Sequence, residues 1–431
     1  MAIWLDATSS EFEADFARLL ATKREISEDV DSIVRGIIED VRTRGDAALI
    51  DYTRKFDRFE LTASTLRVSK AEIAAAKAVC PKPALEALEL AHTRIKAFHL
   101  RQKPQDLRFT DEIGVELGWR WNALEAVGLY VPGGTASYPS SVLMNAIPAK
   151  VAGCPRIVMV VPTPDGKINP LVLAAAELAG VDEVYRIGGA QAVAALAYGT
   201  QTILPVAKIV GPGNAFVAAS KRRVFGTVGI DMIAGPSEVL IVADEYANAS
   251  WIAADLLAQA EHDTAAQSLL ITDNAKLAQA VEKAVESQLK DLARKDIAAA
   301  SWRDHGAIIL VPSVKTCVPL IDRMAPEHLE LMVEDAEAMV LKIRNAGAIF
   351  IGGHTPEAIG DYVGGSNHVL PTARSARFSS GLSVMDFVKR TSILKCSPES
   401  LHALAPAAIA LGEAESLQAH ARSVSIRLNL E

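Results

Sequence analysis

The chain has 431 residues, half of them hydrophobic, and a mean hydropathy of +0.19, so it is long enough to bury the cores of several domains. Its formal net charge is −8 and its pI is about 5.7. This acidity argues against nucleic acids and anionic membranes as partners, because both select a basic surface.

The spacing of the cysteines, the composition of the first residues and the length of the apolar runs argue against further classes of protein. The four cysteines form no CxxC pair, which argues against a thiolate zinc site or a redox pair of that spacing. The start, MAIWLDATSSEFEADF, has no basic region followed by an apolar stretch, and no apolar run reaches the roughly 18 residues of a membrane span. We therefore expect a soluble, cytoplasmic protein in a reducing compartment. The cysteines are Cys80, Cys154, Cys317 and Cys396.

Taken in chain order, the predicted elements begin with helices. Apolar residues recur three and four apart in residues 27–56, and residues 1 to about 100 read as helical. From about 126 to 244, short β-rich runs alternate with helical runs, which predicts a parallel sheet covered by helices. A second, similar succession runs from about 249 to 351. A last segment from about 381 reads as a small helical module.

These patterns predict an α/β fold: two Rossmann-like parallel-sheet domains with smaller N-terminal and C-terminal helical segments. No low-complexity linker separates the parts, so the boundaries follow the changes in periodicity. The predicted boundaries are 1–25 for the N-terminal segment, 26–129 with 238–380 for the first α/β domain, 130–237 for the second, and 381–431 for the C-terminal module.

Three expected strand-to-helix turns carry glycine: 132–135, 188–191 and 211–214. Ligands of parallel sheets bind at the carboxyl ends of strands, where helix N-termini present free N–H groups, and glycine lets the backbone approach them closely. None of the turns is a GxGxxG fingerprint, and each alone fits an ordinary tight turn. Three in one sheet, with a polar or aromatic side chain near each, favour a nucleotide cleft. Those side chains are Tyr130, Gln191 and Asn214.

The segment MAPEHLEL contains the adjacent pair Glu327 and His328. A carboxylate and an imidazole offer proton acceptors with ordinary pKa values of about 4.3 and about 6.5. Chemistry that removes two kinds of proton near neutral pH could use both. Taken alone, such a pair is more often split between a site and solvent. Other candidate site residues favour the functional interpretation: Gln259, His262, Asp361, His368, Glu415 and His420.

Four of these residues form a possible metal set. Gln259 and His262 are three apart in ADLLAQAEH and share a helix face. With Asp361 and His420 they supply two imidazoles, a carboxylate and an amide oxygen, which suit Zn²⁺ or Mn²⁺ better than copper or an iron–sulfur cluster. Glutamine is an unusual ligand and the spacing matches no generic zinc motif. A solvated helix face would also explain His420, so the spacing leaves the metal site open.

Nine ordered segments of the chain are distinctive when read together. They are LYVPGGTASYPSSVLMNAIPAKVAGC, GGAQAVAALAYGT, VGPGNAFVAASK, DMIAGPSEVLIVAD, QAEHD, RMAPEHLEL, GDYVGGSNHVLPT, ARFSSGLSVMDFVKR and EAESLQAHARSVSIR. Together they resemble the histidinol dehydrogenases, and the resemblance runs from about residue 30 to the end. Two departures are small: GGSNH stands where alanine-glycine-proline is common before Asn-His, and Ser416 follows Glu415 in place of glycine. Neither removes a functional side chain.

The resemblance implies NAD-dependent, four-electron oxidation of L-histidinol to L-histidine via L-histidinal, the last step of histidine biosynthesis. It implies one zinc ion per subunit, which anchors the imidazole and amine of the substrate and takes no part in the redox chemistry, since Zn²⁺ has no accessible redox state. The implied ligands are Gln259, His262, Asp361 and His420, in the first α/β domain apart from His420.

The resemblance also assigns the other site residues. His328 takes the alcohol proton, Glu327 activates the water that hydrates the aldehyde, and His328 acts again in the second oxidation. Ser237, His368 and Glu415 contact the substrate together with His328 and the zinc ligands. Tyr130, Gln191 and Asn214 contact NAD in the second α/β domain. The family is a homodimer with shared active sites, in which the C-terminal module, with Glu415 and His420, reaches into the neighbouring subunit.

Three alternatives remain beside this interpretation. A paralogous zinc- and NAD-dependent dehydrogenase of another alcohol, for example a sulfonated diol, would lack the full substrate shell, so the presence of His368 and Glu415 favours histidinol. A zinc hydrolase would use a metal-bound water as nucleophile and need no nucleotide cleft. A non-catalytic metal-binding protein would not need Glu327 and His328.

Overall fold

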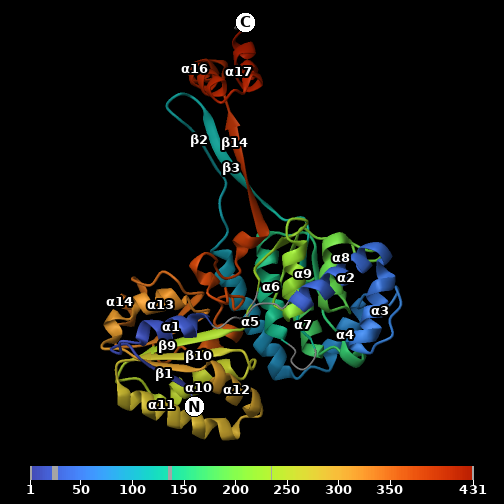
Figure 1. Ribbon diagram of the computed structural model, residues 1–431. Coiled ribbons are helices and arrows are strands. Elements are labelled where there is room, and N and C mark those ends of the chain that lie inside the picture. Colours follow the sequence, from blue (N-terminus) through green and yellow to red (C-terminus); the bar gives the residue numbers. More distant parts are fainter. Residues whose placement is uncertain (1, 22–27, 134–137, 234, 430–431) are drawn as a thin grey trace. The chain divides into compact units, whose positions relative to one another are not determined.

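The computed structural model describes residues 2–21, 28–133, 138–233 and 235–429. The chain divides into two compact units, the first made of residues 1–102 with 125–387 and the second of residues 103–124 with 388–431 (Figure 1). Among the described residues, no helix has the length and apolar character needed to cross a membrane.

The first unit contains a six-stranded sheet in the order β1-β11-β10-β9-β12-β13, in which every neighbouring pair is parallel. Alternate residues of its central strand pack on opposite faces, Leu240 against α1, α13 and α14, and Ile241 against α10, α11 and α12 (Figure 1). Because helices cover both faces of the sheet, these strands are continuously apolar. The strands are β1 (Ile3–Asp6), β9 (Glu238–Ala243), β10 (Gln267–Thr272), β11 (Ala307–Leu310), β12 (His328–Met332) and β13 (Ala348–Ile351); the helices are α1 (Phe12–Ala21), α10 (Ala249–Ala260), α11 (Ala275–Gln288), α12 (Lys295–His305), α13 (Val318–Met324), α14 (Ala336–Val340) and α15 (Glu357–Tyr362).

The first unit also contains a five-stranded parallel sheet in the order β6-β5-β4-β7-β8. Helices α2, α3, α8 and α9 share one hydrophobic core with its strands, and α4 to α7 pack among themselves. The strands are β4 (Val127–Tyr130), β5 (Ile157–Val160), β6 (Glu183–Tyr185), β7 (Lys208–Val210) and β8 (Gly229–Ile230); the helices are α2 (Glu28–Arg44), α3 (Asp46–Asp57), α4 (Lys70–Ala78), α5 (Lys82–Leu100), α6 (Pro139–Ala152), α7 (Pro170–Ala179), α8 (Gly189–Tyr198) and α9 (Ala215–Val224).

The two parallel sheets share one topology. Numbered along the chain, β4 to β8 and β9 to β13 both lie in the order 3-2-1-4-5, and β1 extends the larger sheet beyond β11. The order reverses between β4 and β7 in one sheet and between β9 and β12 in the other. Such switch points are where open α/β sheets bind ligands at their carboxyl edge. The prediction of two Rossmann-like parallel sheets is confirmed.

The structure differs from the predicted placement of elements in three respects. Residues Ile3–Asp6 form a strand paired with β11, although the N-terminal segment was expected to be helical. Val34 of α2 and Leu49 of α3 lie in the core of the five-stranded sheet, although residues 26–129 were assigned to the other α/β domain. Apolar periodicity identifies a buried helix face, but it does not identify the sheet that the face covers.

The third difference is in the second unit. The segment expected to be a helical module from residue 381 contains strand β14 (Val388–Lys395), which pairs antiparallel with β3 (Glu116–Ala123) over its whole length. Strand β2 (Leu107–Thr110) completes this three-stranded sheet. Helices α16 (Pro398–Ala414) and α17 (Gln418–Ser425) follow it (Figure 1). The strand is mostly exposed, so it lacks the apolar run that marked the buried strands.

Candidate functional site

Ser237, Glu327 and His328 meet at the amino edge of the six-stranded sheet. Ser237 precedes β9, and Glu327 and His328 stand at the start of the neighbouring β12. The carboxylate of Glu327 accepts the Ser237 hydroxyl and the backbone N–H of Glu238, the latter at 3.1 Å. Both members of the predicted catalytic pair are buried, at 5% and 4% exposure, so neither is directed into solvent.

The orientation of the His328 ring leaves one nitrogen available as a base. Nδ1 lies 3.0 Å from the carbonyl oxygen of Glu238, which can only accept, so Nδ1 carries the hydrogen. Nε2 is buried without a hydrogen-bond partner among the described residues and lies 4.0 Å from Oδ1 of Asp361. Burial lowers the pKa of His328 to about 4, so the imidazole is neutral at pH 7. A neutral imidazole with a free Nε2 is a proton acceptor.

The pKa of Glu327 is shifted in the opposite direction to that of His328. Burial, supported by the negative charges of Glu238 and Asp361, raises the pKa of the Glu327 carboxyl well above its ordinary value, although its two donors oppose the shift. A carboxyl group with a raised pKa is a better general base and acid near neutral pH. The adjacent pair therefore combines two proton-transfer groups in one enclosed place.

Gln259 is the clearest candidate metal ligand. It lies in the last turn of α10, is fully buried, and neither Oε1 nor Nε2 has a hydrogen-bond partner within the described part of the chain. An unpaired buried amide costs free energy, so such a group needs a partner. Coordination of a cation by Oε1 would supply it. The chemistry of the predicted nitrogen and oxygen donors thus fits a zinc ion.

Asp361 and two histidines lie around the same place. Oδ1 of Asp361 is 4.0 Å from Nδ1 of His368, and the same ring nitrogen lies 3.0 Å from the Asp361 carbonyl oxygen. Burial lowers the pKa of His368, and the charge of His262 lowers it further. The charge of His262 also lowers the pKa of His328, so the His262 ring lies near both His328 and His368. Nε2 of His368 is 3.4 Å from the Ser141 hydroxyl.

The remaining predicted metal ligand, His420, and the remaining predicted substrate contact, Glu415, lie in the second unit. His420 belongs to α17 and Glu415 follows the last turn of α16, and both are exposed there. The described geometry of the first unit therefore brings together Ser237, His262, Glu327, His328, Asp361 and His368, without Glu415 and His420. Gln259 lies in the last turn of α10, three residues before His262.

Two buried acids, Glu330 and Glu357, and the partly buried Asp255 bonded to Glu330 were not predicted. Oε1 of Glu357 lies 3.6 Å from Nδ1 of His328, and single ligand atoms of His328, Glu357 and Asp361 lie within 4.8 Å of one another, close enough to share a metal ion. Glu330 accepts the backbone N–H of Glu357 at 2.8 Å and hydrogen-bonds Asp255. Burial raises the pKa of Asp255, Glu330 and Glu357. The signal in the sequence is HLEL, which puts His328 and Glu330 on one face of a buried strand.

The predicted dinucleotide residues surround the switch point of the five-stranded sheet. Tyr130 ends β4, and its hydroxyl accepts the N–H of Gly189 at the start of α8. Gln191 is buried in the same turn of α8, and Asn214 caps α9 after β7. A Cβ at Gly211, where φ is +109°, would lie 2.2 Å from the Tyr130 carbonyl oxygen, so the turn requires glycine. Of the first glycine turn, Gly134 and Thr135 lie outside the described residues.

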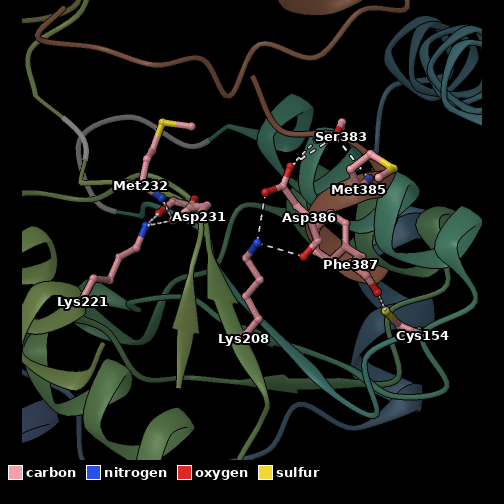
Figure 2. A network of polar contacts seen from close by, with 10 residues as sticks. Cys154, Lys208, Lys221, Asp231, Met232, Ser383, Met385, Asp386 and Phe387 are labelled. Carbon is pink, nitrogen blue, oxygen red and sulfur yellow. Dashed lines mark hydrogen bonds and ion pairs between the residues drawn. The ribbon is translucent and has the colours of Figure 1, made fainter. Parts of the chain in front are cut away.

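A buried ion pair holds the Gly211 turn in place. Figure 2 shows Lys221 of α9 paired with Asp231, with both side chains nearly inaccessible to solvent. Lys221 Nζ donates to the carbonyl oxygen of Gly211 at 3.0 Å, and Asp231 accepts the N–H of Gly211 at 2.8 Å. Both polar groups of the glycine are therefore bonded to one ion pair. The close approach of this turn to Tyr130 follows from these bonds.

Comparison with known proteins identifies the family of the chain. The family model described as histidinol dehydrogenase matches residues 20–428. Histidinol dehydrogenase of Bradyrhizobium diazoefficiens is 68% identical, covering all of both chains, and that of Rhizobium meliloti is 69% identical, covering 100% of this chain and 99% of the relative. The crystal structure of histidinol dehydrogenase from Elizabethkingia anophelis has a TM-score of 0.94 at 38% identity, covering 99% of this chain and 98% of that one. The chain belongs to the histidinol dehydrogenase family, the oxidoreductases of the final step of histidine biosynthesis.

Proposed function

We propose that this chain oxidises L-histidinol to L-histidine through L-histidinal, with two molecules of NAD⁺ as hydride acceptors. The observation that carries the proposal is the buried pair of Glu327 and His328, with Nε2 of His328 free beside Asp361. Two successive oxidations need a base for the alcohol and a group that activates water for the aldehyde. This pair supplies both.

The residue roles follow from protonation and position. Nε2 of His328 accepts the hydroxyl proton of histidinol, because the Glu238 carbonyl oxygen fixes the hydrogen on Nδ1. Glu327 accepts a proton from the water that adds to the aldehyde, since burial raises the pKa of its carboxyl above the ordinary value and makes the carboxylate a stronger base. His328 then accepts the proton of the aldehyde hydrate. Ser237, His368 and Glu415 are the proposed substrate contacts.

Gln259, His262, Asp361 and His420 would hold one zinc ion per subunit. When bound, zinc supplies a Lewis acid that can accept the imidazole and amine of the substrate as further donors. The support within the first unit is the unpaired, fully buried amide of Gln259 and the carboxylate of Asp361 between two imidazoles. NAD⁺ would bind at the switch point between β4 and β7, against Tyr130, Gln191 and Asn214.

We further propose a homodimer with shared active sites, in which Glu415 and His420 complete the site of the partner subunit. The support is their position in the second unit, separate in the chain and in packing from the unit that carries the other site residues. On the net charge of −8 we expect neither a nucleic-acid nor an anionic-membrane partner. A cytoplasmic location is expected from membership of a family of amino-acid biosynthesis.

The test is a stoichiometric assay with purified protein, L-histidinol and excess NAD⁺, followed by NADH absorbance. We expect two NADH for each histidinol consumed, with L-histidine as product and little free aldehyde. One NADH per histidinol with accumulating aldehyde would refute the two-step assignment. A sulfonated diol, offered in parallel, should yield no NADH; the relatives give no support to that substrate.

A further inference from the structure

A cavity of about 460 Å³ opens at the carboxyl edge of the six-stranded sheet. It is lined by residues that follow β9, among them Asp244 and Tyr246, by Met332 and Glu334 at the end of β12, and by Trp251 in the first turn of α10. These are the two strands between which the strand order reverses. The cavity therefore occupies the switch point of this sheet, the place where open α/β sheets bind ligands.

The second parallel sheet provides an internal comparison. Its strands have the same order, and its own switch point, between Tyr130 of β4 and Gly211 after β7, is the proposed NAD cleft. The cavity is the counterpart of that cleft in the six-stranded sheet. It is also distinct from the catalytic group, because His328 begins β12 and Met332 ends it, and Ser237 precedes β9 whereas Asp244 follows it.

The charge of the lining excludes a nucleotide. Asp244 and Glu334 line the cavity, and none of the described residues that line it is a lysine, arginine or histidine. The carboxylate of Asp244 is held in place by the N–H groups of Tyr246, at 3.1 Å, and Glu334, at 2.7 Å. The N–H groups of Ser250 and Trp251, in the first turn of α10, are already bonded by the Asn248 side chain. A phosphate would therefore find repulsion from the carboxylates and few free N–H groups.

Two aromatic side chains, Trp251 and Tyr246, also line the cavity. Trp251 and Tyr246 are 45% and 75% exposed, so both rings are accessible to a ligand. One neighbour of the Trp251 ring is His354, with ring centroids 5.2 Å apart. Exposed indole and phenol rings beside carboxylates attract a cation through the ring faces and through charge.

We propose that this cavity binds a small organic cation, an ammonium group attached to an apolar or aromatic body. The carboxylates of Asp244 and Glu334 balance the charge, and Trp251 and Tyr246 cover the apolar body. The proposal concerns a second ligand site and does not depend on the reaction assigned to Glu327 and His328.

Benzyltrimethylammonium is a suitable probe, titrated by calorimetry into the full-length protein in the presence of saturating NAD⁺. Benzyl alcohol serves as the neutral comparator and benzoate as the anionic one. We expect one saturable site per chain for the cation, with a dissociation constant of about 1 mM or tighter, and at least tenfold weaker binding of both comparators.

Variants then locate the site. Trp251→Ala and Glu334→Gln should each weaken binding of the cation about threefold to tenfold. Glu334 is exposed, so its substitution leaves the fold intact even if Trp251→Ala does not. Glu245→Gln is the matched control, an exposed carboxylate next to Asp244 that does not line the cavity. His328→Ala tests whether the probe enters the catalytic site instead.

The proposal predicts unchanged binding in Glu245→Gln and His328→Ala. Binding lost in His328→Ala would place the probe at the catalytic site and overturn the assignment. Equal affinity for benzoate, equal affinity of Glu334→Gln and the unchanged protein, or no saturable binding of the cation at about 10 mM would each overturn it as well.

Discussion

Nδ1 of His328 lies 3.0 Å from the carbonyl oxygen of Glu238, the residue that begins the neighbouring strand β9. The two strands are parallel, and His328 pairs with Val239. The strand register therefore fixes the tautomer of the proposed base and directs Nε2 away from the backbone. The same register brings the N–H of Glu238 to the carboxylate of Glu327.

Replacing Glu327 with glutamine should separate the two oxidations. The variant keeps the shape of the side chain and loses the proton acceptor for water, so the second oxidation should slow by about 10²-fold or more, while the first is affected less. The NADH yield per histidinol would fall from two toward one, and a carbonyl-trapping reagent would capture the aldehyde. His328→Gln, the comparator, should lose both steps. Equal loss of both steps in Glu327→Gln would contradict a role in hydration.

Removing the metal should stop turnover and spare NAD⁺ binding. The proposed ligands in the first unit lie at the amino edge of the six-stranded sheet, whereas the dinucleotide turns belong to the five-stranded sheet. We expect chelation to abolish NADH formation while NAD⁺ still binds by calorimetry. His262→Ala should lose zinc and activity together, and His402→Ala, an exposed histidine of α16, should lose neither. Normal turnover by metal-free protein would remove zinc from the mechanism.

Breaking the Lys221 and Asp231 pair should weaken NAD⁺ binding. Asp231→Asn removes the charge that holds Lys221 and the N–H of Gly211, so the turn beside Tyr130 loses its fixed position. We expect the KM for NAD⁺ to rise about tenfold with little change in the KM for histidinol, and the free energy of unfolding to fall by about 3 kcal/mol.

Zinc content should stay constant in Asp231→Asn, which separates this effect from damage to the metal site. Arg222→Gln, an exposed neighbour on α9, is the matched control. An unchanged KM for NAD⁺ in Asp231→Asn would show that the ion pair stabilises the fold without positioning the turn.

Some of this architecture was accessible from the sequence and some was not. Runs such as EVLIVA and SLLIT are continuously apolar because both faces are covered, so the two parallel sheets could be predicted. Strand β14, with Lys389 and Arg390 exposed, carries no such pattern and is defined by its pairing with β3. Glu357 follows Pro356 at a helix start, where an acid usually faces solvent. Its burial beside His328 depends on tertiary packing.

The buried acids should make the protein less stable as pH rises toward neutrality. Burial raises the pKa of Glu330, so the folded state binds a proton that the unfolded state has released above the ordinary carboxyl pKa. The free energy of unfolding therefore falls between the ordinary pKa and the raised one.

Glu330→Gln should flatten that decline, since a neutral amide has no proton to lose. Urea unfolding at about pH 5 and about pH 8 should show a difference at least about 1 kcal/mol smaller than in the unchanged protein. Glu337→Gln, an exposed acid of α14, should leave the difference unchanged. The same pH dependence in Glu330→Gln and the unchanged protein would place the titrating group elsewhere.

Mixing two inactive variants should restore activity if active sites are shared between subunits. His328→Ala damages the body of a subunit and His420→Ala damages its C-terminal module, which belong to different units of the chain. In a heterodimer with exchanged modules, one site receives both lesions and the other receives neither. Random co-refolding makes about half of the dimers heterodimers, so about a quarter of all sites should be intact.

The measurement is NADH formation by the co-refolded mixture relative to each variant alone. Differently tagged variants, purified through both tags, show that heterodimers have formed and should reach about half of the unchanged activity per dimer. A pair such as His328→Ala with His262→Ala is the control, since both lesions lie in the body and every site keeps one of them. If the C-terminal module served its own subunit, the tagged heterodimer of His328→Ala and His420→Ala would stay as inactive as its components.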